Sequence, residues 1–156
     1  MPLRQLDAST ELILRWRMDV APDRLWEFLT EPGLLAQWLG RLVAGGVTAD
    51  SDFVVDHGDG YCCRSRVLVH EEPHRLAFTW HFPDEPPSEI ALDLDGAGEG
   101  ATDLRLTHRG LGDLTASYRD GWCVHLTYLE AAALGTPLPA SMFWQLHATV
   151  AALHGS

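Results

Sequence analysis

The spacing of apolar residues changes once along this chain, and that change constrains its fold more than any other feature. Between about residues 51 and 109, apolar and polar side chains alternate, as in the segment Leu-Ala-Phe-Thr-Trp-His-Phe at 76–82. This period of two predicts strands with one buried face, and the short turns between them predict an antiparallel sheet. From about 113 to 134 the period becomes 3.6, which predicts one long helix.

A single long helix can cover only one face of such a sheet. We therefore expect a strongly curved antiparallel sheet that wraps around the helix, because this arrangement buries both apolar surfaces and leaves a gap between them. The apolar stripe of the helix consists of Leu114, Tyr118, Trp122, Leu126 and Leu129. Gly135, followed by two prolines, predicts the end of this helix.

Shorter patterns predict the remaining elements. Residues 10–18 form a first strand, and two short helices follow it, the first beginning at Pro22 and the second running through Trp38. Residues 42–48 could supply an additional strand, so the sheet has six to seven strands and the class is α+β. We expect one domain over 1–156.

The core of that domain spans about 10–135, and 136–156 is an extra tail. Within the tail, the spacing of apolar residues at 140–153 predicts one more helix. Its apolar side chains must be buried either on this domain or on a partner, and the second alternative is a homodimer through this segment.

Charge and composition exclude several functional classes. With 22 acidic and 11 basic residues the net charge is −11, a field that repels nucleic acid and anionic membrane surfaces. No apolar run is long enough to span a bilayer. The three cysteines have no CxxC spacing, which predicts a reduced, cytoplasmic protein without a structural zinc site.

Four motifs carry a resemblance to a known family. They are Ala21-Pro22-x-x-Leu25-Trp26-x-x-Leu29-Thr30-x-Pro32 with Gln37-Trp38; Val69-x-Glu71-Glu72-Pro73-x-x-Leu76-x-Phe78-Thr79-Trp80; Gly100-Ala101-Thr102-x-Leu104-x-Leu106-Thr107-His108-x-Gly110-Leu111; and Gly121-Trp122 with Leu126 and Leu129. Together they resemble the activator-of-heat-shock-protein-ATPase-like family of the START-like, or helix-grip (SRPBCC), superfamily. The resemblance implies a helix-grip fold with a cavity, whereas it implies no single activity. The tail lies outside the shared pattern.

The aromatic residues on the inward faces are the candidate lining of that cavity, although the same side chains would also serve as ordinary core. We predict that a ligand contacts residues from both walls, the sheet and the long helix. The candidates are Trp16, Phe53, His57, Tyr61, Cys63, Phe78, Trp80, Phe82, Leu92, Leu106, His108, Tyr118, Trp122, His125 and Leu126.

The chain shows no set of residues typical of catalysis. No serine lies in a GxSxG context, and we expect neither a metal nor a cofactor. His57, His108 and His125 are the candidates for hydrogen bonding to a ligand or for proton transfer. A core or rim position with satisfied hydrogen bonds is the more common role for such a histidine.

Three hypotheses follow. The first is non-catalytic binding of a small apolar or aromatic ligand between the sheet and the long helix. The second is a co-chaperone-like domain that stimulates a heat-shock-protein ATPase, as the resemblance implies. The third is a cyclase or hydrolase that uses His57 or His108 as a base.

Overall fold

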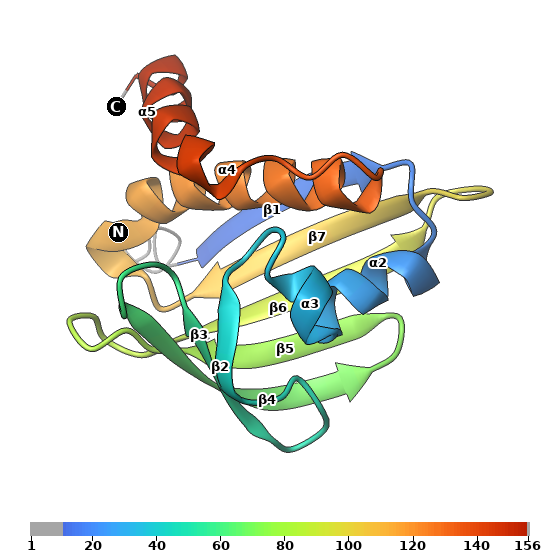
Figure 1. The fold of residues 1–156 in the computed structure, drawn as a ribbon, viewed down its shortest axis with the longest axis horizontal. Coiled ribbons are helices and arrows are strands. Elements are labelled where there is room, and N and C mark those ends of the chain that lie inside the picture. Colours follow the sequence, from blue (N-terminus) through green and yellow to red (C-terminus); the bar gives the residue numbers. More distant parts are fainter. Residues whose placement is uncertain (1–10, 156) are drawn as a thin grey trace, which may run out of the picture.

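The computed structural model describes residues 11–155, in which a curved seven-stranded sheet grips a long helix (Figure 1). In chain order the elements are β1 (Glu11–Met18), α2 (Pro22–Thr30), α3 (Pro32–Leu35), β2 (Arg41–Gly45), β3 (Asp52–Asp56), β4 (Cys62–Glu71), β5 (Arg75–Trp80), β6 (Ser88–Gly96), β7 (Thr102–Arg109), the short 3-10 helix η1 (Gly112–Leu114), α4 (Thr115–Ala133), the 3-10 helix η2 (Ala140–Met142) and α5 (Phe143–Leu153). Residue 10 of the predicted first strand lies outside the described residues.

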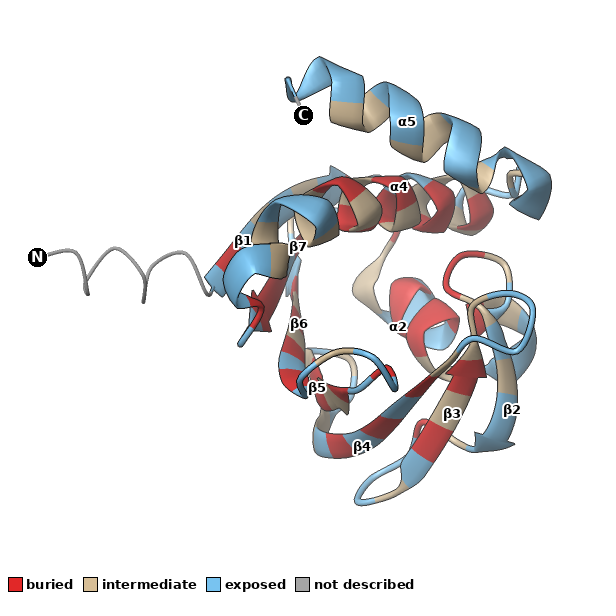
Figure 2. Cartoon of the chain, turned by 90° about the vertical axis from the view of Figure 1, so that its left-hand side faces the viewer, coloured by how far each residue is buried: buried red, intermediate tan, exposed pale blue. Residues whose placement is uncertain are grey.

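The strands follow the order β1-β7-β6-β5-β4-β3-β2, and every neighbouring pair is antiparallel. Figure 2 shows the sheet curling from β1 and β7, beside α4, through β4 to β3 and β2, with α2 inside the curve. The pairing of β4 with β5 shifts register between Val67 and Val69, and such bulges bend a strand. The predicted helix-grip fold is confirmed, and β2 is the seventh strand, which begins at Arg41 and ends at Gly45, short of the expected 48.

The two short helices close the core on the concave side of the sheet. Pro22 occupies the first turn of α2, where its missing N–H costs nothing, and the helix ends at Thr30 just before Pro32. Its apolar face is fully buried. The indole Nε1 of Trp38 donates to the backbone oxygen of Phe28 over 2.7 Å, which ties the chain after α3 back onto α2.

The long helix ends where the sequence predicts. Gly135 adopts a φ of +96°, and the backbone N–H groups of Gly135 and Thr136 donate to the oxygens of Ala132 and Ala131, as in a Schellman motif. Trp122, Leu126 and Leu129 from the predicted stripe are buried against the sheet.

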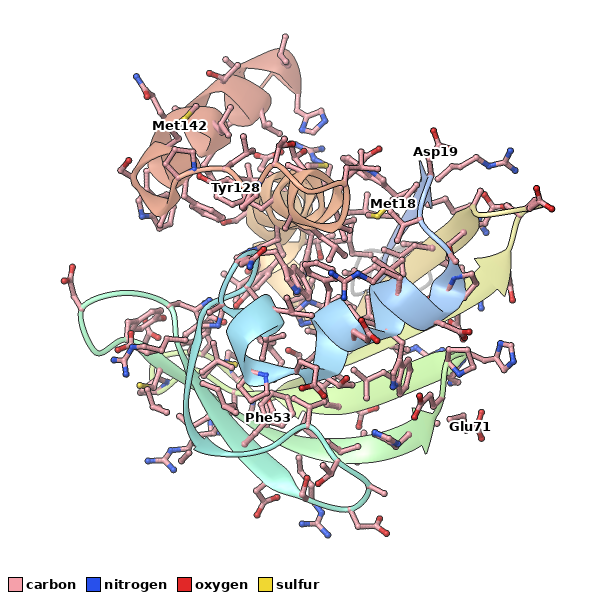
Figure 3. The ribbon with its side chains drawn as sticks, turned by 45° about the vertical axis from the view of Figure 1, so that its right-hand side comes forward. Met18, Asp19, Phe53, Glu71, Tyr128 and Met142 are labelled. Carbon is pink, nitrogen blue, oxygen red and sulfur yellow. The ribbon has the colours of Figure 1, made fainter. Side chains whose placement is uncertain are left out.

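A second face of α4 is also buried, which the single stripe did not predict. Tyr128 is only 3% exposed, because the tail crosses this face and the Tyr128 hydroxyl donates to the backbone oxygen of Pro139. Figure 3 shows Tyr128 between α4 and the tail segment that carries Met142.

The tail forms the predicted helix, α5, and lies on the outer side of α4 (Figure 2). Phe143, Leu146 and Val150 pack against the core, whereas Trp144 is 71% exposed. Of the two alternatives for this apolar face, its own domain or a partner, the protein's own core covers most of it, and the homodimer stays a prediction.

At the far end of α5, His154 Nδ1 donates to Asp120 Oδ1 over 2.6 Å. Asp120 is 3% exposed and also accepts from Arg119. Burial raises the pKa of Asp120, but these hydrogen bonds outweigh it and hold the pKa below its usual range.

Among residues 11–155, no helix is long and apolar enough to cross a membrane. The cytoplasmic location itself stays a prediction.

Candidate functional site

A cavity of about 850 Å³ lies at one end of the gap between the sheet and α4. The chain after α3, the β3–β4 turn, the end of β5, α4 and the tail around Phe143 all contribute to its wall. Cavities of this volume hold drug-sized molecules. Exposed side chains such as Asp59 and Trp144 form part of the lining, so the cavity opens to solvent.

Trp80 is the centre of the aromatic wall. Its ring centroid lies 5.3 Å from that of Trp122 on α4, 5.4 Å from His57 and 5.6 Å from Phe82. Such edge and tilted contacts are the favoured geometries of aromatic pairs. The alternation at 76–82 puts Trp80 and Phe82 on one face, and the cavity lies over the end of that face.

A short hydrogen-bonded chain fixes the polar edge of Trp80. Its Nε1 donates to the Tyr118 hydroxyl over 2.9 Å, and this hydroxyl donates to Glu85 Oε1 over 2.5 Å. Burial, together with the Glu85 carboxylate, raises the pKa of Tyr118 far above its usual value. Tyr118 is therefore neutral and both its hydrogen-bonding roles are already taken.

His108 is a buried core residue and does not line the cavity. Trp122 Nε1 can only donate, and it lies 3.0 Å from His108 Nδ1, so Nδ1 is the unprotonated nitrogen. The proton is on Nε2, which donates to Ser88 Oγ over 2.7 Å. Burial lowers the pKa of His108 to about 3, in keeping with this neutral tautomer. Both nitrogens are occupied, which leaves neither free to act as a base.

His57 and His125 do line the cavity, with their ring centroids 6.0 Å apart. His125 Nδ1 lies 2.9 Å from the backbone oxygen of Trp38. Burial lowers the pKa of His125 to about 4, and burial together with the neighbouring His125 lowers the pKa of His57 to about 3. Both imidazoles are therefore neutral at pH 7.

The charged groups of the lining are mainly acidic. Asp56, Asp59 and Glu85 all contribute, and Arg41, the one lysine or arginine in this lining among the described residues, pairs with Asp56 over 3.2 Å. Among the described residues no group of three or more His, Cys, Asp or Glu side chains could hold a metal ion. That the protein uses no cofactor stays a prediction.

The structure divides the predicted site residues into three groups. Seven line the cavity: His57, Tyr61, Trp80, Phe82, Tyr118, Trp122 and His125. Three line a small apolar void of about 10 Å³ beneath α3 and are core: Phe53 (Figure 3), Phe78 and Leu92. Five lie outside both: Trp16, Cys63, Leu106, His108 and Leu126.

The differences have physical reasons. The alternation of apolar and polar residues identifies the inward face of a strand, but it does not show which part of that face other elements cover. Here α2 and α3 cover the middle of the sheet, so inward residues there are core and do not line the cavity. Trp16 instead donates to Glu130 Oε1 on α4 over 2.8 Å. Burial raises the pKa of the Cys63 thiol to about 12, so this side chain is unreactive core.

Tyr61 lines the cavity in a different way from the one the alternation predicts. It precedes β4 and is 42% exposed, with its ring stacked on Phe82 at 4.3 Å. Its hydroxyl donates to Asp84 over 2.5 Å. Tyr61 therefore covers the outer edge of the aromatic wall, and it is not on the inner face of the strand.

Sequence reasoning missed the contribution of the tail. Phe143, Trp144 and His147 line the cavity, as does Leu138. The available signal was the aromatic pair in a segment that the family pattern does not cover. Because periodicity gives only the face of a helix, it could not indicate that this face lies over the end of the sheet.

The comparisons with known proteins agree with this architecture. Residues 19–133 match the family model described as "Activator of Hsp90 ATPase homolog 1-like protein". CalU16 from Micromonospora echinospora is 27% identical with a TM-score of 0.73, over 94% of this chain and 89% of that one. No curated protein matches.

Two further solved structures share the fold. DynU16, described as a putative protein in the dynemicin biosynthetic locus, is 28% identical with a TM-score of 0.74 over 82% of this chain; the match spans only 49% of DynU16, about half its length. An Hsp90 activator from Plasmodium falciparum is 17% identical with a TM-score of 0.66, over 82% of this chain and 98% of that one. The family model covers most of the chain, which therefore belongs to the Activator of Hsp90 ATPase homolog 1-like family.

Proposed function

We propose that this protein binds a small, largely apolar aromatic molecule in the cavity between the sheet, α4 and the tail. The observation that carries the proposal is a cavity of about 850 Å³ lined with aromatic rings from both walls. Stacking and edge contacts with such rings favour a flat, ring-containing guest. The fold that this chain shares with a protein from a biosynthetic locus gives further support to a small-molecule role.

Gly121 offers a test that does not depend on damaging the fold. It lies on α4 and lines the cavity, and a Cβ added there would meet no atom within 4 Å. Gly121→Leu therefore places a branched side chain in the cavity while replacing glycine in a helix, which stabilises it by about 1 kcal/mol. We expect unchanged or higher thermal stability together with weaker ligand binding.

The matched control is Gly33→Leu, because Gly33 also lies in a helix, has open space around its Cβ and is outside the cavity lining. Binding is measured by the fluorescence of N-phenyl-1-naphthylamine, a neutral apolar probe. The proposal predicts saturable binding to the wild type and to Gly33→Leu, and at least about tenfold weaker binding to Gly121→Leu. Absence of saturable binding to the wild type, or equal binding to both variants, would contradict it.

The family description favours a second candidate, a co-chaperone-like domain that stimulates an Hsp90 ATPase. The test is the rate of ATP hydrolysis by Hsp90 at saturating concentrations of this protein. The candidate predicts a higher rate, and an unchanged rate would remove it. A cyclase or hydrolase with His108 as base has no support, since both nitrogens of His108 are bonded inside the core.

A further inference from the structure

We infer that the ligand carries a neutral aromatic hydroxyl group, which binds between the imidazoles of His57 and His125. The inference rests on the proposed function, because it requires the cavity to be a binding site. It goes further by naming the chemical group that this site selects.

His125 lines the cavity, and its hydrogen bond to the backbone fixes its tautomer. A backbone oxygen can only accept, so His125 Nδ1 carries the proton and donates it to Trp38 O over 2.9 Å. In the neutral ring, Nε2 then carries a lone pair and accepts. Around this nitrogen the cavity is aromatic, with Trp122 5.4 Å and Phe143 4.7 Å from the His125 ring centroid.

His57 makes no side-chain hydrogen bond with any described residue. Its Nε2 is out of contact with solvent and has no partner, while the ring lies among Trp80, Phe82 and His125. An unpaired polar atom away from water destabilises the empty protein. Since no hydrogen bond holds the ring, a half-turn about its Cβ–Cγ bond exchanges nitrogen and carbon positions, so it can present a nitrogen to a guest.

A single ligand oxygen can serve both rings. An oxygen within hydrogen-bonding distance of a ring nitrogen lies roughly 4 Å from the centroid of that ring. The two centroids are 6.0 Å apart, so one oxygen can lie about 4 Å from both of them. A hydroxyl can donate to His125 Nε2 and accept the N–H of His57 at the same time.

Other groups match this pair of rings less well. An ether cannot donate to His125, and a carboxylate can neither donate nor lie comfortably near Asp56, Asp59 and Glu85. An ammonium can donate but cannot accept from His57. The neutral imidazoles offer no positive charge to an anion. The hydroxyl of a phenol satisfies both rings and carries the flat ring that the aromatic wall favours.

Three phenanthrenes of equal ring size test the inference at pH 7: 9-phenanthrol, 9-methoxyphenanthrene and phenanthrene-9-carboxylate. Affinity is measured by isothermal titration calorimetry. We expect the phenol to bind about tenfold or more tightly than the methoxy compound, and the carboxylate to bind weakest. In His57→Phe and His125→Phe, the phenol should fall to within about twofold of the methoxy compound measured on the same variant.

His147→Phe is the matched control, because His147 lines the cavity outside the pair and should leave the preference intact. Binding of the methoxy compound by each variant shows that its cavity is folded. Equal affinities of phenol and ether in the wild type, or a preference that survives in both variants, would overturn the inference while leaving binding itself established. If none of the three compounds binds, the proposed function fails with it.

Discussion

His108→Phe should destabilise the protein through the hydrogen bonds it removes. His108 is completely buried and joins Trp122 Nε1 to Ser88 Oγ. Phenylalanine fills a similar volume but leaves the Trp122 donor unpaired, at a cost of about 1–3 kcal/mol. Ser88 loses less, because its hydroxyl still lies 3.3 Å from Trp80 O.

The two losses together amount to about 3 kcal/mol, which corresponds to a decrease in Tm of roughly 10 °C for a chain of this length. Urea unfolding followed by circular dichroism measures this change. His108→Gln should recover part of it, since its amide again offers one acceptor and one donor. His81→Phe, at an exposed position, is the control. If His108→Phe is as stable as the wild type, the assigned tautomer and its two bonds are wrong.

Three further predictions follow from the burial of polar groups. Histidines of the unfolded chain bind protons below about pH 6.5, whereas the folded chain keeps His57 and His108 neutral down to about pH 3 and His125 down to about pH 4. The free energy of unfolding should therefore fall as pH decreases, and each histidine should account for a loss of about 2 kcal/mol between pH 7 and pH 5. Equal urea midpoints at the two pH values would contradict this. Asp120→Asn removes the charge from the hydrogen bonds to His154 and Arg119. Amide hydrogen exchange in α5 should therefore become faster, while exchange in β6 and β7 stays unchanged. Equal α5 exchange rates in the variant and the wild type would show that the apolar face alone holds the helix. If the homodimer forms, it involves the exposed Trp144, so light scattering should detect a dimer in the wild type and a monomer for Trp144→Ser; a monomeric wild type removes the predicted homodimer.

The change of hydrophobic period was enough to predict the fold. Strands with one buried face and a single long helix leave few arrangements that bury both surfaces, and the observed sheet is one of them. The extent of the cavity was not predictable in the same way. Phe78 and Trp80 lie on the same face of β5, yet α2 and α3 cover the first, whereas the second borders open space.

Long-range contacts account for most of the remaining differences. Tyr128 is buried because the tail crosses α4, and Asp120 is buried because His154 reaches it from 34 positions away. Neither contact leaves a periodic signal in the sequence. Phe143 did give a signal, an aromatic side chain on an apolar helix face, but that signal is equally consistent with a partner surface and with a cavity wall.

For the inward histidines, the hydrogen-bond partners of the ring nitrogens, and not the position in the sequence, distinguish a structural role from a functional one. His57 and His108 both lie at ends of otherwise apolar strand faces, so the sequence pattern treats them alike. In the folded chain both ring nitrogens of His108 are hydrogen-bonded to other side chains, so neither is free to bind a ligand. Among the described residues His57 has none, and His125, which lines the same cavity, has only Nδ1 committed to a backbone oxygen. A buried donor or acceptor without a partner costs stability, and a folded protein keeps such a cost most readily where a bound molecule relieves it.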